Sequence, residues 1–114
     1  MISLTKDKRM LGYEALAPYP DISCFVTTRH GGCSTGNYAS FNCTPYTGDH
    51  PDCVRKNQEL LCAALPFTPR ELVIPFQTHG ISSLIIAETY LNAPHSERHS
   101  MLQGVDALLT RTPR

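Results

Sequence analysis

The chain has 114 residues, 41% hydrophobic and 18% charged, which is the balance of a globular domain at a length that supports one hydrophobic core. Ten basic and ten acidic side chains give a formal net charge of zero, so the sequence predicts neither nucleic acid nor a membrane surface as a partner. Residues 1–9 lack the apolar core of a secretory signal, and no run reaches the roughly 18 apolar residues of a membrane helix. We therefore expect a cytoplasmic protein.

Five cysteines, an odd number without a Cys-x-x-Cys pair, are expected to be free thiols, most of them buried as small hydrophobes. A disulfide framework is the minor alternative, because small secreted scaffolds usually carry an even and denser set. The cysteines are Cys24, Cys33, Cys43, Cys53 and Cys62.

The first predicted element is a strand over residues 23–29, rich in β-branched and aromatic side chains and followed by Gly31-Gly32. This places Arg29 and His30 at a strand end. Residues 33–48 contain small polar residues, glycine and proline, which indicates a long loop. A loop of that length in a compact domain is more often functional than decorative.

A helix is predicted over residues 50–65, with Asp49 as its N-cap, Pro51 in its first turn and Pro66 as its terminator. Asn57 falls on the apolar stripe of this helix, so we expect it to be partly buried and to need hydrogen-bond partners. The apolar residues of the stripe are Val54, Leu61 and Leu65.

Residues 68–71 have the form of a capping box, which favours one short helical turn. Residues 72–76 are apolar but interrupted by Pro75, which indicates an edge or irregular strand. If the extended backbone continues, its alternation projects Gln77 and His79 to the same side, where both polar side chains can face one cavity.

The last part of the chain reads as a buried strand over residues 83–87, an exposed loop over 92–100 and a further strand over 105–110. His95 and His99 have the spacing of a helical metal pair, but Pro94 and the flanking serines favour a solvated loop.

Single residues carry little chemistry on their own. A catalytic zinc takes three protein ligands and keeps a fourth position open, so one histidine is not a site. The turn after Arg29 could offer a guanidinium and backbone N–H groups to an anion, although His30 is equally well explained as an exposed turn residue. His50 is expected to be a helix residue without a special role. A Cys-His nucleophile stays open, since five of each residue occur.

Five motifs taken in order resemble the YfiH-type family, also labelled laccase-domain or polyphenol oxidoreductase. They are TTRHGGCS (27–34), YASFN (38–42), Gly48-Asp49 followed by Val54 and Asn57, QTHG (77–80) and VDALLT (105–110). The resemblance spans residues 23–110. It implies an α+β fold, a mixed β-sandwich flanked by helices, of which residues 1–114 would form the N-terminal portion of a single domain.

The resemblance also implies a zinc-dependent enzyme that acts on purine nucleosides, by phosphorolysis of adenosine and inosine with associated adenosine deaminase activity. His79 would be the first zinc ligand, and His79 and Arg29 would be catalytic. Arg29 would lie near phosphate, with Ser40, Asn42 and Gln77 in the substrate pocket. For Asp106 the resemblance leaves a structural and a catalytic role equally open. The partners would be a purine nucleoside and phosphate.

The family supplies its other two zinc ligands from an Ala-Asp-Cys segment and a His-Ala-Gly-Trp-Arg-Gly segment, and neither occurs here. We therefore expect this chain alone to bind zinc weakly and to be inactive. The alternative is a non-catalytic binding or structural half-domain that associates with another chain, and open sheet edges would favour self-association. A copper oxidase carries less weight, because clustered histidines are not evident.

Overall fold

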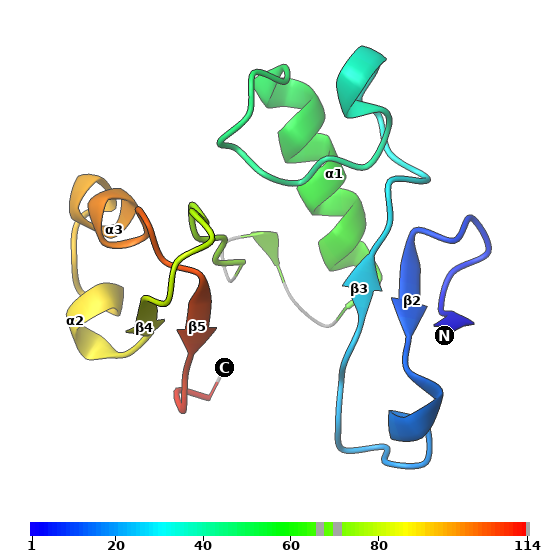
Figure 1. The fold of residues 1–114 in the computed structure, drawn as a ribbon, viewed down its shortest axis with the longest axis horizontal. Coiled ribbons are helices and arrows are strands. Elements are labelled where there is room, and N and C mark those ends of the chain that lie inside the picture. The colour runs from blue at the N-terminus through cyan, green and yellow to red at the C-terminus, as the bar shows by residue number, and fades with distance from the viewer. Residues whose placement is uncertain (66–67, 70–71, 114) are drawn as a thin grey trace. The chain divides into compact units, whose positions relative to one another are not determined.

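The computed structural model describes residues 1–65, 68–69 and 72–113. The chain divides into two compact units, Met1–Leu72 and Val73–Arg114, and each is described here by itself. Figure 1 traces their elements, which include both helices and strands. The predicted α+β class is confirmed, and the β-sandwich stays a prediction. Among the described residues, no helix has the length and apolar character needed to cross a membrane.

The first unit contains a small antiparallel sheet of three strands, β1 (Ile2–Ser3), β2 (Met10–Gly12) and β3 (Val26–Thr27), with β2 in the middle. Figure 1 shows β2 and β3 side by side, joined through the short 3-10 helix η1 (Glu14–Leu16). The strand expected over residues 23–29 is confirmed, but only two of its residues pair, Val26 with Leu11 and Thr27 with Met10.

The segment after β3 runs as a loop to residue 50, as predicted, with one 3-10 turn, η2 (Gly36–Tyr38). The following helix α1 (Pro51–Ala63) confirms the helix prediction and buries Val54 and Leu61 of the expected stripe, whereas Leu65 lies beyond the helix and is partly buried. It ends before Pro66, which lies outside the described residues. The core of the unit joins strand, loop and helix through three buried side chains, Met10, Phe41 and Leu61.

The predicted N-cap of α1 is wrong by one residue. His50 is the N-cap, and its Nδ1 accepts a hydrogen bond of 3.1 Å from the backbone N–H of Asp52. Asp49 cannot take that place because its carboxylate is engaged elsewhere, accepting from Ser34 and from Asn42. His50, expected within the first turn of the helix, instead lies one residue before it.

The second unit contains the parallel strands β4 (Ser83–Ile85) and β5 (Ala107–Leu109), with α2 (Glu88–Leu91) and α3 (His95–Met101) between them in the chain. Both predicted strands are confirmed in shorter form. The burial expected for the first is wrong, because Ser83 and Ile85 are exposed. The core of this unit is formed by Ile86, Tyr90 and Leu102.

The exposed loop predicted over residues 92–100 is wrong, because α3 occupies most of it. Pro94 does not break this helix: it is the N-cap, where its missing N–H and fixed φ cost nothing. Arg98 then ties the helix to the preceding turn, because its Nε donates to the carbonyl oxygens of Tyr90 and Ala93. Its guanidinium also lies 5.4 Å from the centroid of the Tyr90 ring.

The strand predicted over residues 72–76 is also wrong. Its described residues form only an isolated parallel bridge, between Phe76 and Gln103. The alternation that was expected to continue through Gln77 and His79 does not hold, because His79 has a φ of 62°, in the left-handed region. The capping box at residues 68–71 lies partly outside the described residues.

Candidate functional site

The backbone of Arg29 is clamped against residues 39–41. Its carbonyl oxygen accepts from the N–H groups of Ser40 (2.7 Å) and Phe41 (3.0 Å) and from the Ser40 hydroxyl (2.9 Å). In return, Nε of Arg29 donates to the carbonyl oxygen of Ala39 at 3.0 Å. The guanidinium is thus oriented through one nitrogen, while the side chain stays exposed to solvent.

Arg29 and Asn42 line one open depression of about 330 Å³ in the first unit. Its other lining residues are Asn37, Tyr38, Ala39 and Phe41. Ser40 does not line it: its hydroxyl accepts from the N–H of Gly32 at 3.1 Å and donates to Arg29. The structure therefore brings together the three residues of this region that the sequence singled out: Arg29 and Asn42 line the depression, and the Ser40 hydroxyl is bonded to the Arg29 carbonyl.

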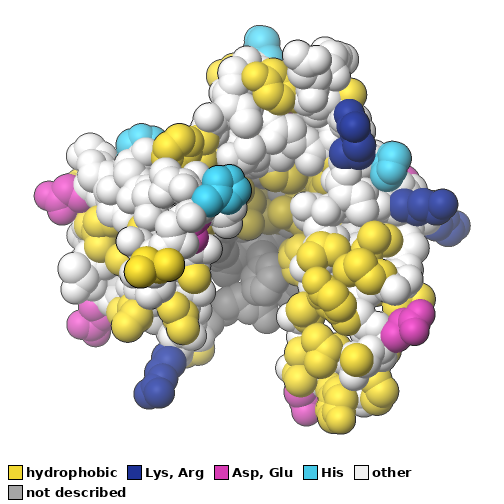
Figure 2. Space-filling view, in the orientation of Figure 1, with side chains coloured by type: hydrophobic (Ala, Val, Ile, Leu, Met, Phe, Trp, Pro, Cys, Tyr) yellow, Lys and Arg dark blue, Asp and Glu magenta, His cyan; other side chains and the backbone are white. Residues whose placement is uncertain are grey.

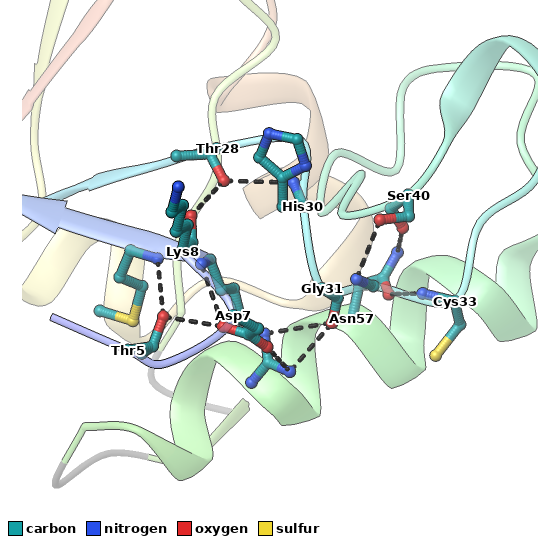
Figure 3. A network of polar contacts seen from close by, with 12 residues as sticks. Thr5, Asp7, Lys8, Thr28, His30, Gly31, Cys33, Ser40 and Asn57 are labelled. Carbon is teal, nitrogen blue, oxygen red and sulfur yellow. Dashed lines mark hydrogen bonds and ion pairs between the residues drawn. The ribbon is translucent and has the colours of Figure 1, made fainter. Parts of the chain in front are cut away.

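Backbone N–H groups of the turn after Arg29 donate to side chains of the protein itself. The N–H groups of His30, Gly32 and Cys33 donate to Thr28 Oγ1, Ser40 Oγ and Asn57 Oδ1 (Figure 3). Gly32 is required by close approach, since a Cβ there would lie 2.1 Å from the carbonyl oxygen of Ser40. An anion at this turn would meet the Arg29 guanidinium and not a row of free backbone N–H groups.

Asn57 holds this loop on α1 and is fully buried, with 0% of its surface exposed. Its Nδ2 donates to Ser34 Oγ (2.9 Å) and to the carbonyl oxygens of Ser40 (3.3 Å) and Asn42 (2.8 Å). Its Oδ1 accepts from the N–H of Cys33 at 2.8 Å, and Figure 3 shows the carboxamide between Cys33 and Ser40. The sequence predicted burial with partners, and the structure confirms it.

Asp49 completes the same network from the far end of the loop. Oδ2 accepts from Ser34 Oγ at 2.6 Å and from Asn42 Nδ2 at 3.1 Å, while Oδ1 accepts from the N–H of His50 at 2.8 Å. The Ser34 hydrogen bond, together with those from Asn42 and His50, holds the pKa of Asp49 below its ordinary value against a smaller opposing effect of desolvation. Sequence reasoning missed this role, because Asp49 had the features of an N-cap.

Gln77 and His79 belong to the second unit, on the loop between Phe76 and β4, and both are exposed. The backbone of this loop wraps one carboxylate. Asp106 Oδ1 accepts from the N–H groups of Thr78 (3.1 Å) and His79 (2.8 Å), and its Oδ2 accepts from Gly80 N–H (2.8 Å). Of the two roles left open for Asp106, these contacts favour the structural one.

The described residues do not fit a complete metal site. Within residues 1–65, 68–69 and 72–113, no group of three or more His, Cys, Asp or Glu side chains could hold a metal ion. The carboxylate nearest to His79 in the hydrogen-bond network, Asp106, already accepts three N–H groups. His95 and His99 do share a helix, α3, contrary to the loop prediction, but they lack a third ligand among the described residues.

Comparison with known proteins gives the family. The family described as "Multi-copper polyphenol oxidoreductase laccase" matches residues 23–114, and the chain belongs to it. The chain is 62% identical over 113 residues to a protein of Bacteroides thetaiotaomicron named purine nucleoside phosphorylase, which covers 99% of the chain and 42% of that protein.

Two more distant relatives have related names. A purine nucleoside phosphorylase of Staphylococcus saprophyticus is 29% identical over 108 residues, covering 95% of the chain and 41% of the relative. An adenosine deaminase from an unknown prokaryotic organism is 32% identical over 90 residues, covering 79% of the chain and 34% of the relative. The chain thus spans about two fifths of the length of the first two relatives and a third of the deaminase.

Proposed function

We propose that the complete protein is a purine nucleoside phosphorylase that acts on adenosine and inosine, with adenosine deamination as an associated activity. The observation that carries the proposal is the 62% identity, over nearly the whole chain, to a protein named purine nucleoside phosphorylase. The deaminase name of a second relative supports the associated reaction. The substrates would be a purine nucleoside and phosphate, in the cytoplasm.

Arg29 is proposed to bind the attacking phosphate. Its Nε is fixed on Ala39, and no contact to its two terminal nitrogens is made within the described residues, so these donors stay available at the rim of the depression. A planar guanidinium pairs with phosphate oxygens through two parallel hydrogen bonds, which a lysine cannot reproduce. Asn42 would form the adjoining pocket wall, with Ser40 supporting Arg29 from below.

His79 is proposed as a catalytic residue and as one ligand of a zinc ion, with Gln77 beside it in the substrate pocket. Because the described residues do not supply a complete ligand set, we expect the 114-residue chain by itself to bind zinc weakly and to be inactive. The copper in the family's name makes copper the lesser alternative.

The test is made on the complete natural protein. Elemental analysis should find stoichiometric zinc, and His79→Ala should abolish inosine phosphorolysis while His95→Ala, an exposed histidine of α3, leaves it unchanged. Arg29→Met should raise the KM for phosphate by about 10- to 100-fold, the effect of losing one or two charge-assisted hydrogen bonds. Arg55→Met on the exposed face of α1 is the matched control. Absence of zinc together with full turnover by His79→Ala would refute the proposal.

A second candidate function, a half-domain that associates with another chain, is favoured by the β4–β5 sheet. Ile85 and Leu109 pair in register, and 68% and 55% of their surfaces are exposed. Parallel sheets are normally covered on both faces. The two residues also line an open groove of about 990 Å³.

Self-association through this sheet face is measured by sedimentation. We expect the 114-residue chain to form dimers or larger species, and Ile85→Lys to return it to the monomer, because a charge on the buried face of an interface costs several kcal/mol. Val26→Lys, at an exposed apolar residue of β3, is the control. Hydrophobic side chains also gather over β2 and η1 (Figure 2). If Val26→Lys makes the chain monomeric, the chain associates through that face of the first unit and not through the β4–β5 sheet.

A further inference from the structure

We propose that Asp106 is a positioning residue, which fixes the loop at residues 77–81 so that His79 is presented in one orientation. The proposal rests on the proposed function, because it gives His79 a role in turnover. It concerns a residue that the proposed site does not include.

The Asp106 carboxylate accepts hydrogen bonds from the backbone of this loop. Both oxygens of Asp106 accept from consecutive N–H groups: Oδ1 from Thr78 and His79, at 3.1 and 2.8 Å, and Oδ2 from Gly80, at 2.8 Å. Three successive donors that converge on one carboxylate require a tightly turned backbone, which an extended strand cannot provide. The turned conformation of the loop brings the three N–H groups onto the carboxylate, and the carboxylate in turn stabilises that conformation.

The backbone of His79 adopts a conformation that has to be held in place. Its φ of 62° lies in the left-handed region, where a side chain with a Cβ costs roughly 1–2 kcal/mol. Such conformations persist where the surroundings hold them in place, and they concentrate at functional sites. The N–H of His79 is itself one of the three donors to Asp106, so the carboxylate offsets this cost at the residue where it arises.

Both ends of the loop are anchored to the segment that carries Asp106. Phe76 exchanges two backbone hydrogen bonds with this segment, from its N–H to the Leu102 carbonyl (3.0 Å) and from the Gly104 N–H to its own carbonyl (2.9 Å). At the other end, the N–H of Asp106 donates to the carbonyl of Ser82 at 2.9 Å. The loop is thus closed at its base, and the carboxylate fills its centre.

Gly80 shows how tightly the loop closes. A Cβ on Gly80 would lie 3.3 Å from Asp106 Oδ2, closer than nearly all ordinary contacts of a Cβ. The hydrogen bonds to Asp106 come from backbone N–H groups of the loop, whereas the side chain of His79 is exposed. Asp106 therefore acts through His79 and is not a catalytic residue itself.

The structural arm of the test measures amide hydrogen exchange in the complete protein. Asp106→Ala should speed exchange of the N–H groups of Thr78, His79 and Gly80 by at least about 10-fold, because each loses its acceptor. Asp106→Asn keeps the side-chain volume but only one of the two acceptor oxygens. We therefore expect the N–H groups of Thr78 and His79 to stay protected from exchange and that of Gly80 to lose its protection. Unchanged exchange at all three residues in both variants would overturn the proposal.

The kinetic arm measures inosine phosphorolysis. Misplacement of a reacting group by about 1 Å costs on the order of 10²-fold in rate, so Asp106→Ala should lower kcat by about that factor with little change in KM. An unchanged kcat in Asp106→Ala, or a loss that appears only as a raised KM, would overturn the proposal.

Glu97→Gln is the matched control, an exposed carboxylate of α3 for which neither exchange in the loop nor turnover should change. The two arms also separate this inference from the proposed function. If His79→Ala leaves phosphorolysis intact, the proposed function fails, and the exchange measurement still decides whether Asp106 fixes the loop. If His79→Ala abolishes turnover but Asp106→Asn and Asp106→Ala do not lower it, only the positioning role fails.

Discussion

The hydroxyl of Ser34 donates a hydrogen bond of 2.6 Å to Oδ2 of Asp49, and the same hydroxyl accepts from Nδ2 of Asn57 at 2.9 Å. Ser34 is buried, with 4% of its surface exposed. One hydroxyl therefore links the loop that carries Arg29, the residue before the N-cap of α1 and the buried face of that helix. The first two predictions follow from this arrangement.

Asn57→Ala should lower the free energy of unfolding by about 3 kcal/mol, because it leaves the Cys33 N–H and the Asn42 carbonyl without their partner in a buried place. Urea denaturation followed by circular dichroism measures the change. Lys56→Ala, on the exposed face of the same helix, should stay within about 0.5 kcal/mol. Equal effects of the two substitutions would contradict the role assigned to Asn57.

Asp49 should make stability depend on pH in the acid range. Its pKa is lower in the folded protein than in the unfolded chain, chiefly because of the Ser34 hydrogen bond, so the unfolded state binds more protons there. The stabilisation is complete above the ordinary Asp pKa of roughly 3.9 and is lost as the pH falls through the lower folded value. Thermal unfolding at a series of pH values should show this loss. Asp49→Asn should reduce the slope of the unfolding temperature against pH in the acid range. An equal slope in the variant would count against the prediction.

Gly32→Ala should destabilise the first unit by about 3 kcal/mol, because the added Cβ would lie 2.1 Å from the carbonyl oxygen of Ser40 and 2.5 Å from the Cα of Phe41. Both are backbone atoms, which cannot rotate away. Gly36→Ala is the comparison: its Cβ meets nothing within 4 Å, but a φ of 61° costs roughly 1 kcal/mol. The prediction fails if Gly36→Ala is the more destabilising of the two in thermal unfolding.

The thiols should differ widely in reactivity. All five cysteines are thiols that form no disulfide; Cys24 is exposed and Cys62 is buried. Burial, with a smaller contribution from Cys62, raises the pKa of Cys43 to about 11, so its reactive thiolate is scarce at neutral pH. Titration with a disulfide reagent at pH 7 should modify Cys24 first, and Cys24→Ser should remove that fast phase. Modification of Cys43 and Cys62 should require denaturant, and fast labelling of either would refute the prediction.

Local patterns predicted the parts of the fold that depend on local contacts. The apolar stripe identified α1 and placed Asn57 on its buried face, because helical periodicity is encoded within one segment. The same reasoning missed α3, since Pro94 resembled a helix breaker although it is an N-cap. It also missed the shape of the loop at residues 77–81, which depends on Asp106, a residue 26 to 28 positions further along the chain.

The candidate site was likewise predicted in part, and the rest depends on contacts between segments that are distant in the sequence. The resemblance singled out Arg29, Ser40 and Asn42, and the structure shows them in one network. It could not show that the Ser40 hydroxyl is consumed by Gly32 and Arg29, because those contacts depend on how the loop closes. The roles of these residues in binding substrate, and those of Gln77 and His79, stay predictions.

The position of Asn57 in the chain has a consequence for synthesis on the ribosome. Its four hydrogen-bonded partners precede it by 15 to 24 residues. During translation, the segment that carries Arg29 therefore leaves the exit tunnel before the side chain that anchors it to α1, and these four hydrogen bonds form only after residue 57 has followed. Because the closure entropy of a loop grows only slowly with its length, the anchoring of this segment on α1 is timed by the emergence of a single asparagine.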